Sequence, residues 1–140
     1  MSYATIADIR SELDEDVLVQ LTDDDDTGET DTDIVDKALA DANAVVDGYI
    51  GKRHDLPFAS PPAILAKLET DIAIVNLFNR RNGPPEHRQK QYENAIAFLE
   101  KVNAGKITLG PNDPDGTSQA DKAQVSSRDA IFTRDTLENW

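Results

Sequence analysis

A chain of 140 residues is long enough for one domain, and 39% hydrophobic residues give that domain a modest core. The absence of cysteine excludes disulfides, thiolate nucleophiles and cysteine-ligated metals. A net charge of −13 argues against a conventional nucleic-acid-binding protein, because such proteins neutralise phosphates with clustered Lys and Arg.

The charge is concentrated at one end of the chain. Residues 1–36 hold 13 acidic residues and one basic residue, whereas residues 37–140 hold 14 acidic and 13 basic residues. This asymmetry indicates that the N-terminal quarter differs in role from the body. No signal peptide opens the chain, and no apolar run reaches the roughly 18 residues of a membrane helix, so we expect cytoplasmic synthesis and no membrane partner.

Two short helices are predicted at the start. Thr5, with Asp8 three residues on in a capping-box-like position, predicts a helix over about residues 6–11. Asp14 can cap a second helix over about residues 15–21. Apolar side chains at helical spacing support both predictions.

An acidic loop, residues 22–33, follows these helices and contains no apolar residue. It opens with the four carboxylates Asp23, Asp24, Asp25 and Asp26. A calcium site is one interpretation, because an EF-hand loop aligned from Asp23 finds Gly28 at its sixth place. The twelfth place, however, is Ile34, which cannot give the bidentate carboxylate. The sequence therefore favours a solvated, mobile loop, and we expect no metal and no cofactor.

The strongest helical pattern comes next. Thr32 or Asp33 is the predicted cap, and the helix is expected to run to about Arg53. Its predicted central seam is Val35, Ala38, Ala42, Val45 and Tyr49, with Ile34, Leu39, Val46 and Ile50 on its flanks. The pattern lasts only about two heptads, which indicates a bundle helix rather than a long coiled coil.

Two further long helices complete the predicted bundle. Pro61-Pro62 opens the first, which is apolar over more than half its circumference and should be the central helix, ending at Asn82-Gly83. Pro84-Pro85 opens the second, which should end near Ala104 with Gly105 as a stop. The first two turns of this last helix contain no apolar residue, so they should project past the core or meet a polar partner.

The sequence offers little chemistry. His54 and His87 are both expected at the surface, and neither lies in a metal-ligand spacing. No phosphate-binding loop, nucleophile elbow or dinucleotide fingerprint occurs, so we expect no enzyme. The nearest approach to a basic patch is interleaved with Glu86 and consists of Arg80, Arg81, Arg88 and Lys90.

The last segment, residues 106–140, differs in kind from the rest. Ordering 35 residues costs about 1–2 kcal/mol each in backbone entropy, whereas burying its seven sizeable apolar side chains returns about 1.5–3 kcal/mol each. We therefore expect an arm that orders only against a partner. Its end reads as a short linear anchor formed by Ile131, Phe132, Thr133, Arg134, Leu137 and Trp140.

The predicted fold is therefore mainly α. We expect a small helical bundle of about three long and two short helices over residues 1–105, with the acidic loop at 22–33. Residues 106–140 should form an extended C-terminal arm.

Several segments together resemble the small neck proteins of Mu-like tailed phages and prophages. They are the opening Met1-Ser2-Tyr3-Ala4-Thr5-Ile6-Ala7-Asp8-Ile9, the Asp-rich loop, the stretch from Tyr49 to Pro57, and the closing Ser126-Ser127-Arg128 with Phe132-Thr133-Arg134-Asp135-Thr136-Leu137. The likeness covers essentially the whole chain.

The resemblance implies a structural virion protein with no catalytic residue. It implies a head-to-tail connector, or head-completion adaptor, that forms a ring beneath the portal protein, commonly twelvefold, and meets other neck and tail-completion proteins. DNA would be only passing cargo. The protein would be made in the host cytoplasm and end in the neck of the virion. In such a ring Asp23–Asp26 could face the channel and repel DNA.

Two other interpretations stay open at the level of sequence. One is a DNA-mimic module whose acidic face occupies the nucleic-acid site of another protein, although its acids cluster in one loop instead of spreading over a surface. The other is the calcium-binding module.

Overall fold

The computed structural model describes residues 2–110, and this part of the chain holds five helices and no strand. Two are short, α1 (Ile6–Glu12) and α2 (Glu15–Thr22), and three are long, α3 (Thr32–Ile50), α4 (Ala63–Phe78) and α5 (Glu86–Asn103). The prediction of a mainly α bundle with three long and two short helices is confirmed.

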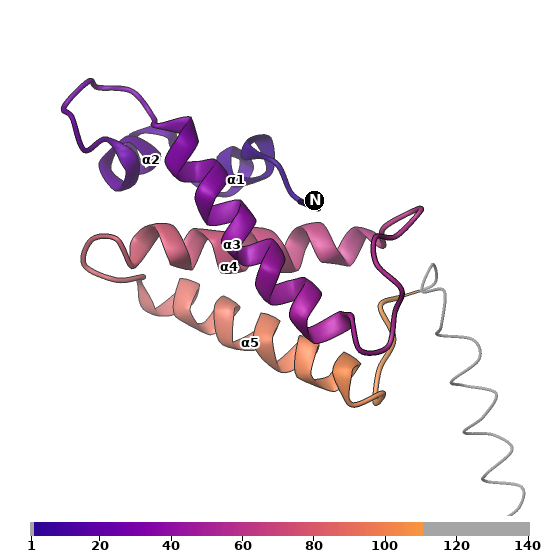
Figure 1. Ribbon diagram of the computed structural model, residues 1–140. Helices are drawn as coiled ribbons and strands as arrows, with labels where there is room; N and C mark the ends of the chain where they lie inside the picture. Colours follow the sequence, from indigo (N-terminus) through magenta and orange to yellow (C-terminus); the bar gives the residue numbers. More distant parts are fainter. Residues whose placement is uncertain (1, 111–140) are drawn as a thin grey trace, which may run out of the picture.

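Helix α4 is the centre of the bundle, as its apolar circumference predicts. All four other helices pack against it. Every residue from Leu68 to Val75 is buried. In Figure 1, α4 and α5 run antiparallel side by side, α3 crosses them, and α1 and α2 lie beside the first half of α3.

The predicted seam of α3 is confirmed at Val35, Ala38 and Ala42 and is wrong at Val45. Val45 is 37% exposed, whereas its neighbour Val46 is fully buried. The buried stripe is Val35, Ala38, Leu39, Ala42, Asn43, Val46 and Ile50. The stripe includes a polar residue because Asn43 donates a hydrogen bond to the carboxylate of Glu69, at 3.1 Å, inside the bundle. Apolar spacing alone could not predict that partner.

Several helix ends follow from their capping residues. Asp31, one residue before the predicted caps, begins α3 by accepting hydrogen bonds from the N–H groups of Asp33 and Ile34. The α3 helix ends at Ile50, three residues before the predicted end, and α4 ends at Phe78 in place of Asn82-Gly83. Gly105, with φ of +77°, terminates α5 as predicted.

One residue in the polar first half of α5, Arg88, has its partner within the chain, whereas Glu86, His87, Gln89 and Lys90 are exposed. The Arg88 side chain is only 11% exposed, and its guanidinium donates to the Glu12 main-chain oxygen at 2.7 Å and to the Glu12 carboxylate at 3.3 Å. Arg88 therefore ties the start of α5 to the end of α1, which is the polar contact that the sequence left open.

The predicted surface position of His54 is wrong. The residue was expected at the surface, but it is 6% exposed. The turn after α3 folds His54 back onto the bundle, where its main-chain N–H donates to the Ile50 oxygen at 3.1 Å. The centroid of its ring lies 5.6 Å from that of Phe58. His87 is exposed, as expected.

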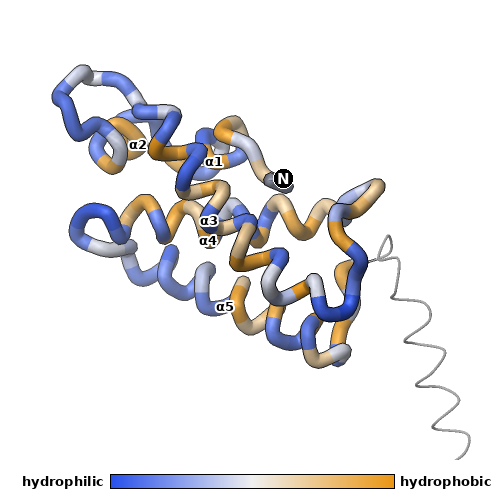
Figure 2. The backbone as a smooth tube through the Cα atoms, viewed as in Figure 1, coloured by the Kyte–Doolittle hydropathy of each residue, from blue (hydrophilic) through white to orange (hydrophobic). Residues whose placement is uncertain are grey.

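The connections at one end of the bundle are hydrophilic, whereas those at the other end are mixed in hydropathy (Figure 2). The acidic loop and the turn between α4 and α5 are both hydrophilic and lie at the same end of the bundle. The α3–α4 loop and the last described residues lie at the other end. Within residues 2–110, no helix is both long and apolar enough to cross a membrane.

Candidate functional site

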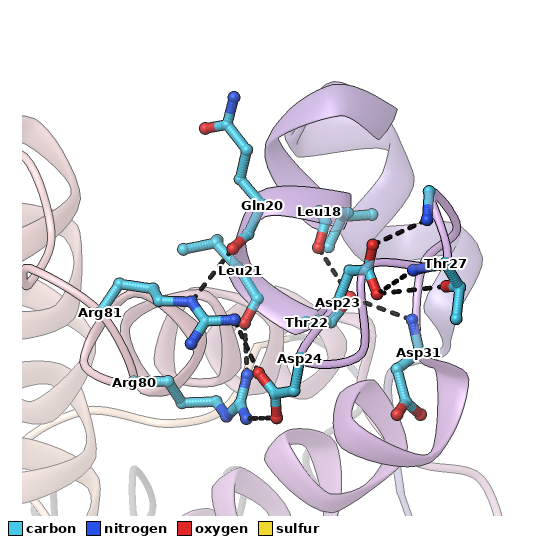
Figure 3. Close-up of polar contacts among 11 residues, drawn as sticks. Leu18, Gln20, Leu21, Thr22, Asp23, Asp24, Thr27, Asp31, Arg80 and Arg81 are labelled. Carbon is cyan, nitrogen blue, oxygen red and sulfur yellow. Dashed lines mark hydrogen bonds and ion pairs between the residues drawn. The ribbon is translucent and has the colours of Figure 1, made fainter.

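The acidic loop begins and ends on one buried hydroxyl. Thr22, at the end of α2, has no exposed surface, and its hydroxyl donates to the Leu18 oxygen at 2.7 Å. The same hydroxyl accepts from the N–H of Asp31 at 3.0 Å, where α3 begins. The Thr22 hydroxyl thus holds the two ends of the loop next to each other (Figure 3).

The Asp23 carboxylate stabilises the turn of the loop by accepting hydrogen bonds from main-chain N–H groups of the loop. One carboxylate oxygen accepts from the N–H of Thr27 at 2.9 Å, and the other accepts from the N–H of Gly28 at 2.8 Å. These main-chain donors lower the pKa of Asp23, because they stabilise the charged carboxylate. Gly28, with φ of +80°, adopts the left-handed conformation that the turn requires.

Asp24 fastens the loop to the turn that follows α4. Its two oxygens accept from the guanidinium groups of Arg80 and Arg81, each at 2.6 Å (Figure 3). These contacts lower the pKa of Asp24. The same two arginines donate to the main-chain oxygens of Leu21 and Gln20, at the C-terminal end of α2. We call this set of contacts the Asp24 clamp.

The Asp24 clamp joins two features that looked separate in the sequence, the acidic loop and the apparent basic patch. Two arginines of the apparent basic patch, Arg80 and Arg81, satisfy carbonyls at the end of a helix where positive charge is favourable. A third, Arg88, is bound to Glu12. Three of the four residues of the patch therefore make contacts within the chain, and these contacts give no support to binding of nucleic acid.

The outward part of the loop keeps its charge exposed. Asp25, Asp26 and Glu29 are all exposed, and Asp26 has a positive φ of 56°. At the base of the loop, the Thr30 hydroxyl donates to the Glu15 carboxylate at 2.7 Å and lowers the pKa of Glu15. The loop is solvated over residues 24–29, as expected, but hydrogen bonds at Asp23, Asp24 and Thr30 tie down a loop that the sequence predicted to be mobile.

The calcium interpretation gains nothing from this geometry. Asp23, the proposed first ligand, has both oxygens bonded to main-chain N–H groups of the loop itself. Among the residues that the structure describes, no group of three or more His, Cys, Asp or Glu side chains is placed to hold a metal ion.

The most tightly built polar cluster lies elsewhere and was missed by the sequence analysis. Glu69, in the middle of α4, is fully buried. Its carboxylate accepts from the N–H of Tyr3 at 3.0 Å, from the N–H of Ala4 at 3.3 Å and from the Asn43 amide at 3.1 Å. A signal was present, because Glu69, Thr70 and Asp71 interrupt the most apolar helix of the chain.

The same cluster continues to the surface through Tyr3. Its hydroxyl donates to the Asp47 carboxylate at 2.5 Å. Burial, followed by this hydrogen bond and the charges of Asp47 and Glu69, raises the pKa of Tyr3 above its ordinary value. The N-terminal residues are thus bound to the bundle at both main chain and side chain.

The six predicted anchor residues, Ile131, Phe132, Thr133, Arg134, Leu137 and Trp140, lie outside the described residues. Of the predicted site, the structure brings together Asp23 and Asp24 with their partners and places Asp25 and Asp26 at the exposed tip.

Comparison with known proteins bears on the whole chain. The family model described as Bacteriophage Mu, Gp36 matches residues 3–127. The chain belongs to this Gp36 family of Mu-like phages. One relative, "Mu-like prophage FluMu protein gp36" of Haemophilus influenzae, is 35% identical over 107 residues, which cover 76% of this chain and 74% of the relative. Another, "Gene product J" of Escherichia phage Mu, is 31% identical over 141 residues, which cover 96% of each chain.

The match to the Gp36 family takes in the helical bundle but ends before the six predicted anchor residues. Its range begins at Tyr3, whose N–H bonds to Glu69, includes the acidic loop and the Asp24 clamp, and continues to residue 127 in the predicted arm. The resemblance to a Mu-like phage family that the sequence indicated is confirmed at the level of the family.

Proposed function

We propose that this Gp36-family chain is a non-enzymatic structural protein of the virion, which serves as a head-to-tail connector or head-completion adaptor. The observation that carries the proposal is the family match over residues 3–127, together with a phage Mu relative aligned over nearly its full length. The proposed partners are the portal protein and other neck and tail-completion proteins. The proposed assembly is a ring beneath the portal, commonly twelvefold, through which DNA passes as cargo.

The described residues support a structural role in a specific way. Their strongest polar contacts, around Glu69, Asp24 and Arg88, each join segments that lie far apart in sequence. A subunit that must keep its shape against neighbours benefits from such cross-links, because each removes a way for the bundle to open. The bundle thereby offers rigid surfaces for the repeated heterologous contacts that close a ring.

The tip of the acidic loop is proposed to face the channel. Asp25, Asp26 and Glu29 are exposed, whereas Asp23 and Asp24 hold the loop in place. A fixed tip of negative charge would repel the phosphates of passing DNA and keep DNA from adhering. Only the exposed carboxylates should matter for this role.

Neutralising the exposed carboxylates of the tip distinguishes their role from that of Asp23 and Asp24, which hold the loop in place. In the phage that carries this gene, the variant with Asp25→Asn, Asp26→Asn and Glu29→Gln should assemble normally but differ from the wild type in DNA retention or in ejection. The double variant Asp23→Asn with Asp24→Asn should instead weaken the loop itself. Unchanged retention and ejection in the tip variant would refute the channel role, while leaving the connector proposal standing.

The connector role is tested by removing the gene. A phage that lacks the chain should accumulate heads and tails that are not joined, visible by electron microscopy, and addition of the purified chain to such a lysate should produce joined particles. Joined particles in the absence of the chain would contradict the proposal.

A further inference from the structure

A hollow of about 370 Å³ opens at the surface beside the N-terminus. Most of its lining is apolar or aromatic, and the α3–α4 loop supplies most of it; the lining residues are Ser2, Tyr3, Asp47, Leu56, Pro57, Phe58 and Pro61. The Phe58 ring stands 6.4 Å from the Tyr3 ring and 5.6 Å from the His54 ring, between centroids. The hollow therefore has an aromatic wall and a single carboxylate.

The wall of this hollow is held from behind. Tyr3 is bound through its N–H to the buried Glu69 and through its hydroxyl to Asp47. His54, which supports Phe58, is itself buried. A hollow with fixed walls binds a side chain at a lower entropic cost than one that must first form.

The described chain ends close to this part of the bundle. The last described residues lie at the same end as the α3–α4 loop (Figure 1), and the guanidinium of Arg53, which is in that loop, lies next to Gly105. From Gly110 to Ile131 the chain has 21 residues, which span at most about 70 Å when extended. This length is enough to reach a neighbouring copy in a ring.

The end of the arm carries an apolar pair and a positive charge that complement the aromatic wall and the carboxylate of the hollow. Ile131 and Phe132 are adjacent apolar residues, and Arg134 follows two residues later. A phenylalanine ring packs well against aromatic and proline side chains. A guanidinium pairs with a carboxylate through charge-assisted hydrogen bonds, and Asp47 supplies that carboxylate at the hollow.

We propose that the segment Ile131-Phe132-Thr133-Arg134 of one copy binds in this hollow of a neighbouring copy, with Phe132 against Phe58 and Arg134 beside Asp47. The inference rests on the proposed function, because a ring supplies the neighbour. It identifies the groove that the linear anchor enters, and it makes each subunit both donor and acceptor in a head-to-tail contact.

Engineered cysteines test the contact directly, because the full chain contains none. A Ser2→Cys chain is mixed with an equal amount of a Thr133→Cys chain under mild oxidation, and disulfide-linked pairs of the two different chains are counted by mass spectrometry. Docking should raise their yield at least about tenfold over control pairs by raising the effective concentration of the two sulfurs. The matched controls are Ser11→Cys, an exposed serine on α1, in place of Ser2→Cys, and Thr117→Cys in place of Thr133→Cys.

The outcomes are distinct. A yield equal to that of the controls overturns the proposal. A chain carrying both Ser2→Cys and Thr133→Cys that links within itself, even when diluted into excess wild-type chain, also overturns it, because the arm would then occupy its own hollow. Adding Phe132→Ala to the Thr133→Cys chain should remove the excess over the controls. Binding of the wild-type chain to the portal is measured separately, so loss of cross-linking with intact portal binding rejects this contact and keeps the proposed function.

Discussion

At the scale of single residues, Glu69 has the least expected environment in the molecule. It is a fully buried carboxylate whose partners come from the N-terminal main chain and from α3. Charge-assisted hydrogen bonds of this kind offset the cost of burying the charge only while every partner stays in place. The N-terminal residues are thus held by a group more than sixty residues away in sequence.

Removing this carboxylate should be costly. Glu69→Ala leaves the N–H groups of Tyr3 and Ala4 without their acceptor, so we expect the free energy of unfolding to fall by about 2–4 kcal/mol in urea titrations. Hydrogen exchange at those two amides should also accelerate. The matched variant Glu93→Ala, on the exposed face of α5, should change stability by less than about 0.5 kcal/mol. Equal effects of the two variants would contradict this role of Glu69.

We expect Tyr3 to make the stability of the fold depend on pH in the alkaline range. Its pKa is raised in the folded state, so the folded protein holds the phenolic proton more tightly than the unfolded chain does. This contribution is fully present below the ordinary tyrosine pKa of about 10 and is lost as pH rises through the raised value.

The check is the urea midpoint measured at increasing alkaline pH. The wild type should lose stability above about pH 10, and Tyr3→Phe should lose less over the same range because it has no phenol to ionise. Tyr92→Phe is the matched control and should follow the wild type. A Tyr3→Phe profile parallel to that of the wild type would show that Tyr3 does not cause the dependence.

At the scale of elements, the Asp24 clamp joins the acidic loop to the turn between α4 and α5. Asp24→Ala removes the acceptor shared by Arg80 and Arg81, so hydrogen exchange in residues 23–31 should increase. Asp25→Ala, at the exposed tip, is the control and should leave that exchange unchanged.

The stabilisation that the Asp24 clamp gives to the loop should decrease in acid and at high salt. Because the pKa of Asp24 is lowered, its contribution is present above the ordinary aspartate pKa of about 3.9 and is lost as pH falls through the lowered value. High salt should weaken it, since the carboxylate is exposed. Identical exchange in Asp24→Ala and Asp25→Ala at neutral pH would mean that the clamp does not hold the loop.

The elements themselves could largely be predicted from sequence. Capping residues and prolines fixed where helices begin, so α1, α2 and α5 start as expected and α3 starts one residue early. Helix ends were less certain, because the turns after Ile50 and Phe78 continue with helix-like hydrogen bonds. Periodicity found α3 and the buried positions Val35, Ala38 and Ala42, but it could not include Asn43, whose amide bonds to Glu69 inside the bundle.

The candidate site was predictable in part. Charge alone located the acidic loop, but charge could not tell that Asp23 and Asp24 have structural partners while Asp25 and Asp26 are exposed. The contacts of Asp24 join residues separated by more than fifty positions in sequence, and they depend on how α2 and α4 pack. His54 was misplaced for the same reason, since its burial depends on the turn after α3.

At the scale of the whole molecule, the two ends of the bundle suggest different tasks. One end carries the clamped acidic loop, and the other carries the aromatic hollow together with the last described residues. In the proposed ring, the first end would meet passing DNA and the second would bind the arm of a neighbour. Membership of the Gp36 family of Mu-like phages places this arrangement in a phage protein, and the connector role is the proposal built on it.

The most direct test of that role is the mass of the purified full chain mixed with purified portal ring, measured by light scattering during size-exclusion chromatography. The proposal predicts a joint complex that contains as many copies of this chain as the portal has subunits. A chain that elutes as a monomer at every concentration, with the portal mass unchanged, would contradict it.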